Sequence, residues 1–237
     1  MDSGSSFFYS KSMPGTLYIV GTPIGNLQDM TPRALTTLRA VNLILAEDTR
    51  VVKKLLSHFD IHVPTERFDA NAGAGMVERI IGKLRGGASL ALVSDAGTPA
   101  ISDPGSWLVA EVVRALGNEV KIIPIAGPSA VTAALSVSGF HADIFTFYGF
   151  PPHKKGRSAR LKEIAATEHT VVLFESPHRI EKTLAELSAI CPERRAVICR
   201  ELTKMFETVE RGALSELARS GRIRPQGEFV IVLGPIN

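Results

Sequence analysis

Short apolar runs and amphipathic stretches alternate along the first 139 residues of the chain. The apolar runs fall at 16–20, 42–46, 89–93 and 120–125. Short runs that are apolar throughout are typical of strands covered on both faces, whereas the stretches between them carry apolar residues at helical spacing. The alternation therefore predicts a parallel sheet with helices on each of its faces.

Helix boundaries are marked by capping residues, prolines and glycines. Thr31 and Asp103 each place a capping side chain before a proline at the first helical position. Gly127 opens a third helix, and Gly117 and Gly139 end the second and the third. The predicted helices therefore begin near 32, 104 and 128, with a further helix over 77–84.

The pattern changes after Gly139. A strand-like run at 144–150 leads into a basic, proline-rich connection with the sequence PPHKKGR. A helix is predicted over 158–166, and strands over 170–174, 196–200, 208–211 and 228–233. We therefore expect an α/β protein of two α/β domains, residues 15–125 and 126–237, with the boundary within 125–144. Residues 1–14 are expected to form a flexible tail before the first domain.

The composition narrows the class of protein and of partner. Hydrophobic residues make up 45% of the chain and charged residues 22%, which is ordinary for a globular protein. The net charge of +3 permits a nucleic-acid partner through phosphate contacts but does not require one. Cys191 and Cys199 have neither CxxC nor metal-ligand spacing, so we expect free thiols in a reducing cytoplasm and no metal. With no apolar run near the ~18 residues that cross a bilayer and no secretory signal, no membrane partner is expected.

Loops after the predicted strands are the expected place for a site, because open α/β sheets bind ligands at the carboxyl ends of their strands. The loop GTPIGN at 21–26 is neither GxGxxG nor GxxxxGK[ST], which argues against a dinucleotide or triphosphate cradle, and a tight turn also explains it. The loop AEDTR at 46–50 has three charged residues after a buried strand. It is either a helix start capped by Asp48 or Thr49, or a site that orders a polar substrate.

The loop SDAGTPAISDPG at 94–105 has the strongest functional signal. A plain strand-to-helix connection needs only ~2–6 residues. Gly97 allows a ligand to approach the main chain, while Asp103 is expected to cap the next helix. The loop AGPSA at 126–130 offers N–H groups of a helix start at Gly127 and Ser129, although close packing of helix on sheet explains it equally well.

Two loops of the second half, FESPHR at 174–179 and RELTK at 200–204, combine both charges. His178 is more typical of a loop or cap residue than of a catalytic base. A basic run of the second domain comprises Lys154, Lys155, Arg157 and Arg160. It is either a solvated helix start or a contact for RNA phosphates.

Taken in order and spacing, these motifs resemble one family. They are LYIVGTPIGNLQDMTPRAL, LAEDTR, ALVSDAGTPAISDPG and PIAGPSA, followed by FYGF, FESPHR, RELTK, FETVERG and GEFVIVLG. Over residues 15–234 the chain is similar to the ribosomal RNA small subunit methyltransferase I family, a branch of the tetrapyrrole methylases. The resemblance implies a class III methyltransferase fold, two α/β domains with S-adenosylmethionine bound in the cleft between them, and a homodimer. It also implies 2′-O-methylation of a decoding-centre cytidine in 16S ribosomal RNA of the small ribosomal subunit.

The resemblance assigns cofactor contacts residue by residue. They are Pro23, Asp95, Gly97, Thr98, Ile101, Ser129, Ala130, Phe174, Glu175 and Leu202. Methyl transfer is mainly a matter of positioning, but a ribose hydroxyl reacts faster beside a base or a cation. The candidates for that role are Glu47, Asp48, Arg50 and Lys204, and the sequence does not choose among them.

The chain departs from the family pattern in two places. It has Ala70-Asn71-Ala72 where relatives usually carry His-Asn-Glu, and it stops at Asn237 where relatives often continue. One alternative is a methylase of the same fold that acts on a tetrapyrrole or corrinoid precursor or on a modified histidine. Such enzymes have a Gly-Asp-Pro loop where this chain has Gly97-Thr98-Pro99. The other alternative is a non-catalytic nucleotide- or RNA-binding module, which a test of S-adenosylmethionine binding would separate.

Overall fold

The computed structural model describes residues 15–236, which divide into two compact units. The first unit contains residues 15–22 and 30–127, and the second contains 23–29 and 128–236. The predicted tail, residues 1–14, lies outside the described residues. No helix within 15–236 is long and apolar enough to cross a membrane. Each unit has its own sheet and its own core.

The first unit is built on a five-stranded sheet of order β3-β2-β4-β1-β5. Its strands are β1 (Thr16–Val20), β2 (Leu43–Ala46), β3 (Thr65–Arg67), β4 (Ser89–Val93) and β5 (Lys121–Ile125). All neighbouring pairs are parallel, so the prediction of a parallel sheet is confirmed. The edge strand β3 was missed because its sequence, Thr-Glu-Arg, contains no apolar run.

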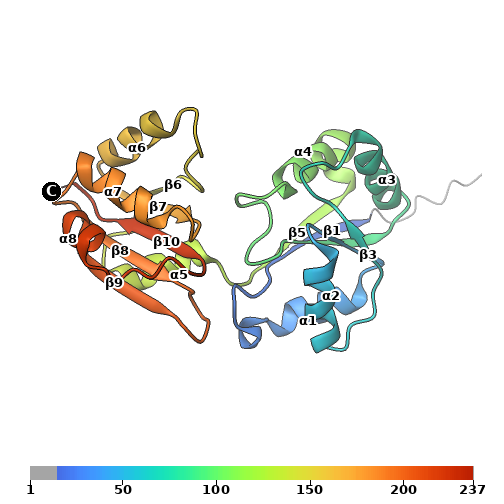
Figure 1. Cartoon of the computed structure of the whole chain (residues 1–237). Helices are drawn as coiled ribbons and strands as arrows, with labels where there is room; N and C mark the ends of the chain where they lie inside the picture. The colour runs from blue at the N-terminus through green and yellow to red at the C-terminus, as the bar shows by residue number, and fades with distance from the viewer. Residues whose placement is uncertain (1–14, 237) are drawn as a thin grey trace, which may run out of the picture. The chain divides into compact units, whose positions relative to one another are not determined.

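Helices cover both faces of this sheet. They are α1 (Pro32–Ala40), α2 (Thr49–His58), α3 (Ala74–Arg85) and α4 (Gly105–Leu116), with a 3₁₀ turn at Gly117–Glu119. Successive strand residues point to opposite faces, so Leu43 and Leu45 join the core under α3 and α4 while Ile44 packs under α1 and α2. Figure 1 shows the two helix pairs on opposite sides of the sheet. The predicted cap Thr31 accepts a hydrogen bond from the N–H of Ala34.

The second unit contains a mixed sheet of order β6-β7-β10-β8-β9. Its strands are β6 (Phe145–Phe147), β7 (Thr170–Glu175), β8 (Arg195–Arg200), β9 (Thr208–Ala213) and β10 (Phe229–Leu233). Only β6 and β7 run parallel among these described pairs, and the others are antiparallel. The run predicted at 144–150 is shorter as a strand, because Gly149 takes a positive φ of 61° and two prolines follow it.

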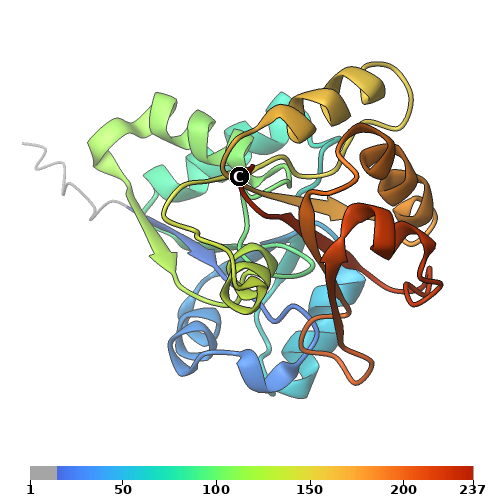
Figure 2. The same cartoon turned by 90° about the vertical axis from the view of Figure 1, so that its left-hand side faces the viewer.

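The second sheet is also covered on both faces. Its helices are α5 (Ala130–Ser138), α6 (Arg157–Ala166), α7 (Ile180–Ile190) and α8 (Leu214–Arg219); a 3₁₀ turn, Leu27–Asp29, belongs to the same unit. In β10, Phe229 and Ile231 pack with α6, α7 and α8, whereas Val230 packs with α5. Helices α7 and α8 lie side by side, as two views show (Figures 1 and 2).

One buried cation, Arg194, ties three segments of the second unit together. Its guanidinium donates to main-chain carbonyls of Ile164, Ala165, Thr167, His169 and Gly234, at 2.7–3.2 Å. Carbonyls at the end of α6 attract a cation because the negative end of the helix dipole lies there. The guanidinium therefore joins the end of α6, the approach to β7 and the segment after β10.

We predict that Arg194→Met lowers the free energy of unfolding of the second unit by ~3–5 kcal/mol, because buried carbonyls lose their partners. Urea unfolding followed by circular dichroism measures the change. Arg195→Met is the matched control, since Arg195 is the next residue and is exposed. Equal stability of the two variants would contradict a structural role of Arg194.

Candidate active site

The loops after β1 and β4 are joined by two backbone hydrogen bonds. The N–H of Thr22 donates to the carbonyl of Gly97 at 2.9 Å, and the N–H of Gly97 donates back at 3.1 Å. The buried Thr22 hydroxyl donates to the Ser94 carbonyl, and the Ser94 hydroxyl donates to the carbonyl of Ala96. β1 continues to α1 on one face of the sheet and β4 to α4 on the other, so this pair lies where an open α/β sheet places its ligand.

The rest of the 94–105 loop holds strained backbone. Ala100 and Ser102 have φ of 69° and 62°, a left-handed conformation that side chains disfavour. The Asp103 carboxylate accepts hydrogen bonds from the N–H groups of Ala100 at 2.8 Å and Gly105 at 2.7 Å. The N-cap position of α4 is Pro104, one residue later than predicted, so Asp103 binds the first N–H of the helix from the residue before the cap. Strain of this kind persists where the surroundings hold it, and it clusters at functional sites. Ile101 is 49% exposed between the strained residues.

Two glycines are required where the loops after β1 and β5 meet. A Cβ built on Gly21 would lie 2.8 Å from the Cα of Gly127, and one built on Gly127 would lie 2.9 Å from the Cα of Gly21. Both obstacles are main chain, so a side chain at either position forces the backbone apart. In the second unit, Ser129 precedes α5 and makes no side-chain cap, which leaves the first N–H groups of that helix without one.

Acidic side chains gather around the end of β2. The N–H of Asp48 donates to the Asp95 carboxylate at 3.0 Å, which links the loops after β2 and β4. Burial raises the pKa of the Glu47 carboxyl above its ordinary value, and the negative charges of Asp95 and Asp103 raise it further. The Glu47 carboxylate is therefore a stronger base than that of an ordinary glutamate.

Asp48 has the opposite environment. It is the N-cap of α2, and it accepts hydrogen bonds from both the side chain and the main chain of Arg50. These bonds hold the pKa of Asp48 far below its ordinary value. Asp48 therefore stays a carboxylate paired with the exposed Arg50 and is a weak base, so its predicted role as a cap is confirmed.

Lys204 stands on a second strained loop, in the second unit. Glu201 and Thr203 have φ of 53° and 69°, and the Thr203 hydroxyl is buried without a partner among the described residues. The Lys204 ammonium contacts Glu201 at 2.9 Å and Glu228 at 3.0 Å. Burial lowers the pKa of Lys204, but the hydrogen bonds to the two carboxylates outweigh it and raise the pKa overall. Lys204 is thus a cation and not a base.

Three of the predicted cofactor residues come together in the second unit. Ala130, Phe174 and Leu202 are half-buried against the core between α5 and the sheet. The Phe174 ring meets the ring of Phe147 edge-on at 4.9 Å and that of Phe150 at 5.5 Å. They form an apolar surface at the ends of β7 and β8, while Pro23 is buried in the segment that belongs to this unit.

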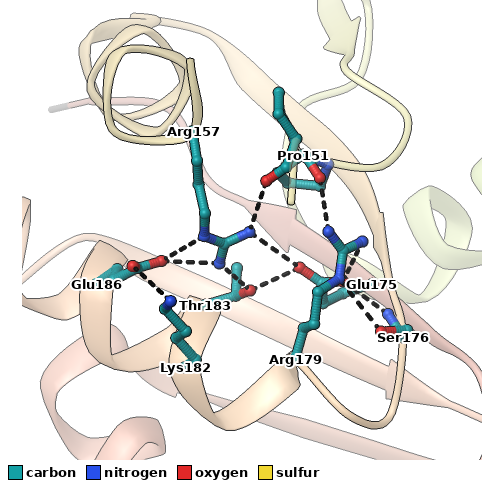
Figure 3. A network of polar contacts seen from close by, with 9 residues as sticks. Pro151, Arg157, Glu175, Ser176, Arg179, Lys182, Thr183 and Glu186 are labelled. Carbon is teal, nitrogen blue, oxygen red and sulfur yellow. Dashed lines mark hydrogen bonds and ion pairs between the residues drawn. The ribbon is translucent and has the colours of Figure 1, made fainter. Parts of the chain in front are cut away.

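Glu175 differs from these residues because its carboxylate is wholly inside the unit (Figure 3). It accepts from the N–H of Ser176 at 2.7 Å and the hydroxyl of Thr183 at 2.6 Å. It also pairs with Arg179 at 2.7 Å and lies 3.9 Å from Arg157. Both oxygens of the carboxylate are therefore bound by protein groups, and these contacts hold the loop that follows β7 and the start of α7.

Two of the four residues of the basic run make ion pairs within the second unit. Arg157 is buried and pairs with Glu186 at 2.7 Å, so the expectation that it reaches RNA phosphate is wrong. Arg160 pairs with Glu163 and lies over the Tyr148 ring. Lys154 and Lys155 are exposed. Within residues 15–236, no group of three or more His, Cys, Asp or Glu side chains is arranged to hold a metal ion.

Residues 16–218 match the family model of the tetrapyrrole (corrin/porphyrin) methylases. The chain belongs to the tetrapyrrole methylase family. Within this family, a protein of Xylella fastidiosa named ribosomal RNA small subunit methyltransferase I is 48% identical over 94% of this chain and 82% of its own length. A Thermotoga maritima protein of the same name is 46% identical over 92% of this chain and 98% of its own. The crystal structure of diphthine synthase has the same fold, with a TM-score of 0.71 at 16% identity, over 93% of this chain and 90% of that one.

Several residues of this tetrapyrrole methylase were not singled out from the sequence. The hydroxyls of Thr22 and Ser94 donate to main-chain carbonyls of the loop after β4, and Arg179 and Thr183 bind the Glu175 carboxylate. In the sequence, these residues are visible only as polar positions inside or beside apolar runs. Their partners, however, are far along the chain, and spacing alone does not identify them.

We predict that Asp95→Asn lowers the pKa of Glu47 toward its ordinary value, because a negative charge beside the carboxyl is removed. A ¹³C NMR titration of the Glu47 side chain measures the shift. Asparagine can still accept from the N–H of Asp48, so the loop contact is kept. Asp60→Asn, at an exposed aspartate beyond α2, is the control and leaves this pKa unchanged. An unaltered pKa in Asp95→Asn would show that solvent screens the Asp95 charge.

Proposed function

We propose that this chain transfers a methyl group from S-adenosylmethionine to the 2′-hydroxyl of a cytidine in 16S ribosomal RNA of the small ribosomal subunit. The observation that carries the proposal is the high identity, over most of the chain, to relatives named ribosomal RNA small subunit methyltransferase I. By the same resemblance we propose that the working form is a homodimer in the cytoplasm.

Residues in each unit suit S-adenosylmethionine. In the first unit, the Thr22–Gly97 pair forms a rigid floor, and Gly97 removes the side chain that would separate a ligand from the main chain. In the second, Phe174 and Leu202 offer apolar surface of the kind that adenine stacks on. The proposed contacts are Pro23, Asp95, Gly97, Thr98, Ile101, Ser129, Ala130, Phe174 and Leu202. Glu175 is omitted because its carboxylate is engaged inside the protein.

The chemistry left to the protein is orientation and removal of a proton. When bound, S-adenosylmethionine supplies a methyl group on a positively charged sulfur, which becomes a neutral thioether as the ribose oxygen takes that methyl. A ribose hydroxyl must lose its proton during this displacement. Of the four candidates, Glu47 is the carboxylate whose surroundings raise its pKa, so we propose that it takes the proton. Asp48 orders α2, and Lys204 is a fixed cation for charged substrate.

We predict that Glu47→Gln slows single-turnover methyl transfer by ~10²–10⁴-fold, because the amide cannot accept the proton. Binding of S-adenosylmethionine, measured by calorimetry, should stay near the parent value. In the parent enzyme, the rate should fall as the pH drops through the raised pKa of Glu47, since the carboxylate form is the active one.

Asp48→Asn is the matched control, because asparagine still caps a helix. It should keep the fold and most of the transfer rate. If Asp48→Asn or Lys204→Met loses the rate while Glu47→Gln keeps it, the proton acceptor has been assigned to the wrong residue.

The proposed function itself is tested with small subunits that lack the modification. The chain is incubated with them and with methyl-labelled S-adenosylmethionine, and the RNA is digested to nucleosides for mass spectrometry. We expect labelled 2′-O-methylcytidine. Label on a porphyrin or corrinoid precursor, or on a base, would overturn the proposal, as would calorimetric binding without any transfer.

A further inference from the structure

The connection between β6 and α6, residues 148–156, is part of the longest acid-free basic stretch of the second unit. Residues 144–162 contain no aspartate or glutamate. The stretch carries five lysines and arginines, which are Lys154, Lys155, Arg157, Arg160 and Lys162. Arg157 and Arg160 are neutralised by Glu186 and Glu163. Lys154 and Lys155 are exposed at the end of the connection and take part in none of the ion pairs within residues 15–236.

Although it has no regular structure, this 148–156 loop is fixed at several points. The carbonyl of Gly149 accepts from the N–H of Phe174 at 2.9 Å, which ties the start of the loop to β7. The carbonyl of Pro151 accepts from Arg179 at 2.8 Å, and that of Pro152 accepts from Arg157 at 3.3 Å. The two arginines thus hold successive carbonyls of the loop.

Glu175 holds both of these arginines in turn. Its carboxylate lies 2.7 Å from Arg179 and 3.9 Å from Arg157, and Figure 3 shows it between the two guanidinium groups. Thr183 donates to the same carboxylate and accepts from Arg157 at 2.8 Å. The arginines that hold the Pro151 and Pro152 carbonyls therefore share one buried carboxylate on β7, and Glu186 is a second, closer partner of Arg157 at 2.7 Å.

The same loop carries an exposed aromatic residue, Phe150, four positions before Lys154. Phe150 is 54% exposed, although its ring is supported from beneath by Phe174 at 5.5 Å. A loop that carries both a supported, exposed ring and exposed lysines outside any ion pair offers base stacking and phosphate contacts, which proteins combine when they bind single-stranded RNA. Because the clamps already fix the loop, little entropy is lost when RNA binds it.

We infer that the 148–156 loop is an RNA-binding arm in which Phe150 stacks on an unpaired base and Lys154 and Lys155 contact phosphates. Glu175 is its positioning residue. The inference rests on the proposed function, because it names the surface of this chain that takes the RNA substrate.

The first experiment compares the parent chain with Lys154→Gln/Lys155→Gln and with Phe150→Ala. Methyl transfer to small subunits is measured against salt concentration, and binding is measured separately by co-sedimentation. The lysine variant should flatten the dependence of log binding on log salt by about 0.7 for each lost phosphate contact. Phe150→Ala should raise KM for small subunits by about 5- to 150-fold at unchanged kcat.

Lys83→Gln/Lys121→Gln is the matched control. Lys83 lies in the last turn of α3 and Lys121 begins β5, so both exposed lysines lie away from the loops that follow the carboxyl ends of the first sheet's strands. This variant loses the same charge and should behave as the parent. Calorimetry with S-adenosylmethionine completes the set, because loss of cofactor affinity in Phe150→Ala would make that ring part of the cofactor site and overturn its assignment to RNA.

The second experiment tests Glu175 through a double-mutant cycle. Glu175→Gln alone should raise KM for small subunits and leave kcat and cofactor affinity unchanged. Added to the triple variant Phe150→Ala/Lys154→Gln/Lys155→Gln, it should raise KM no further, since residues that act through the same loop are not additive. Arg179→Gln, which removes only one clamp, gives the same comparison if Glu175→Gln does not fold.

These experiments distinguish failure of the RNA-binding arm from failure of the proposed methyl transfer. If the parent methylates small subunits and the loop variants match it in salt dependence and KM, the arm is wrong and the function stands. If the parent transfers no methyl group, the function fails, and co-sedimentation still decides whether the loop binds RNA. Additive effects of Glu175→Gln would remove its positioning role.

Discussion

The paired hydrogen bonds between Thr22 and Gly97 are the constraint on which the first site depends. β1 and β4 are neighbours, yet the helices that follow them pack on opposite faces of the sheet, so their loops must separate above the strand ends. The Thr22–Gly97 pair keeps the two loops joined at their base, and the hydroxyls of Thr22 and Ser94 donate to the buried carbonyls of Ser94 and Gly97. On that base Asp103 can hold the strained segment before α4, which would relax in an unsupported loop.

The same arrangement gives neighbouring carboxylates different properties. Glu47 and Asp48 are adjacent in sequence, but burial and then the neighbouring acids raise the pKa of Glu47, whereas hydrogen bonds from Arg50 lower that of Asp48. The pKa values of these carboxyls therefore depend on which loops the backbone brings together. The hydrogen bond from the Asp48 N–H to the Asp95 carboxylate helps to hold the loops after β2 and β4 in place. Lys204 shows the converse case, because two carboxylates keep a partly buried ammonium protonated.

Sequence reasoning succeeded where the signal is local. Apolar runs located nearly all strands, and the caps Thr31 and Asp48 depend on hydrogen bonds to residues two or three positions away. It failed where the outcome depends on which way a side chain points or a strand runs. The run KKGR reads as uniformly basic, but Gly156 takes φ of 80° before α6 and the next side chain, Arg157, is buried. Helix α7 was missed because no side chain caps it, although its apolar spacing is regular. The antiparallel pairing of β8 and β10 is not indicated by any local sequence pattern. Tertiary partners decide these features.

Buried arginines explain how the second unit fixes segments that have no regular structure. Arg194 is satisfied almost entirely by carbonyls and joins parts of the unit remote from β7, so it contributes to the fold alone. Arg157 donates to the carbonyl of Pro152 and Arg179 to that of Pro151. Unlike that of Arg194, their charge is balanced by carboxylates, those of Glu186 and Glu175. A planar guanidinium can hold a carboxylate and a carbonyl at once in fixed directions, which an ammonium cannot do. Burial of these charges is thus compatible with stability because each donor has an acceptor, and it leaves the loop they hold rigid while its outer residues remain available to a partner.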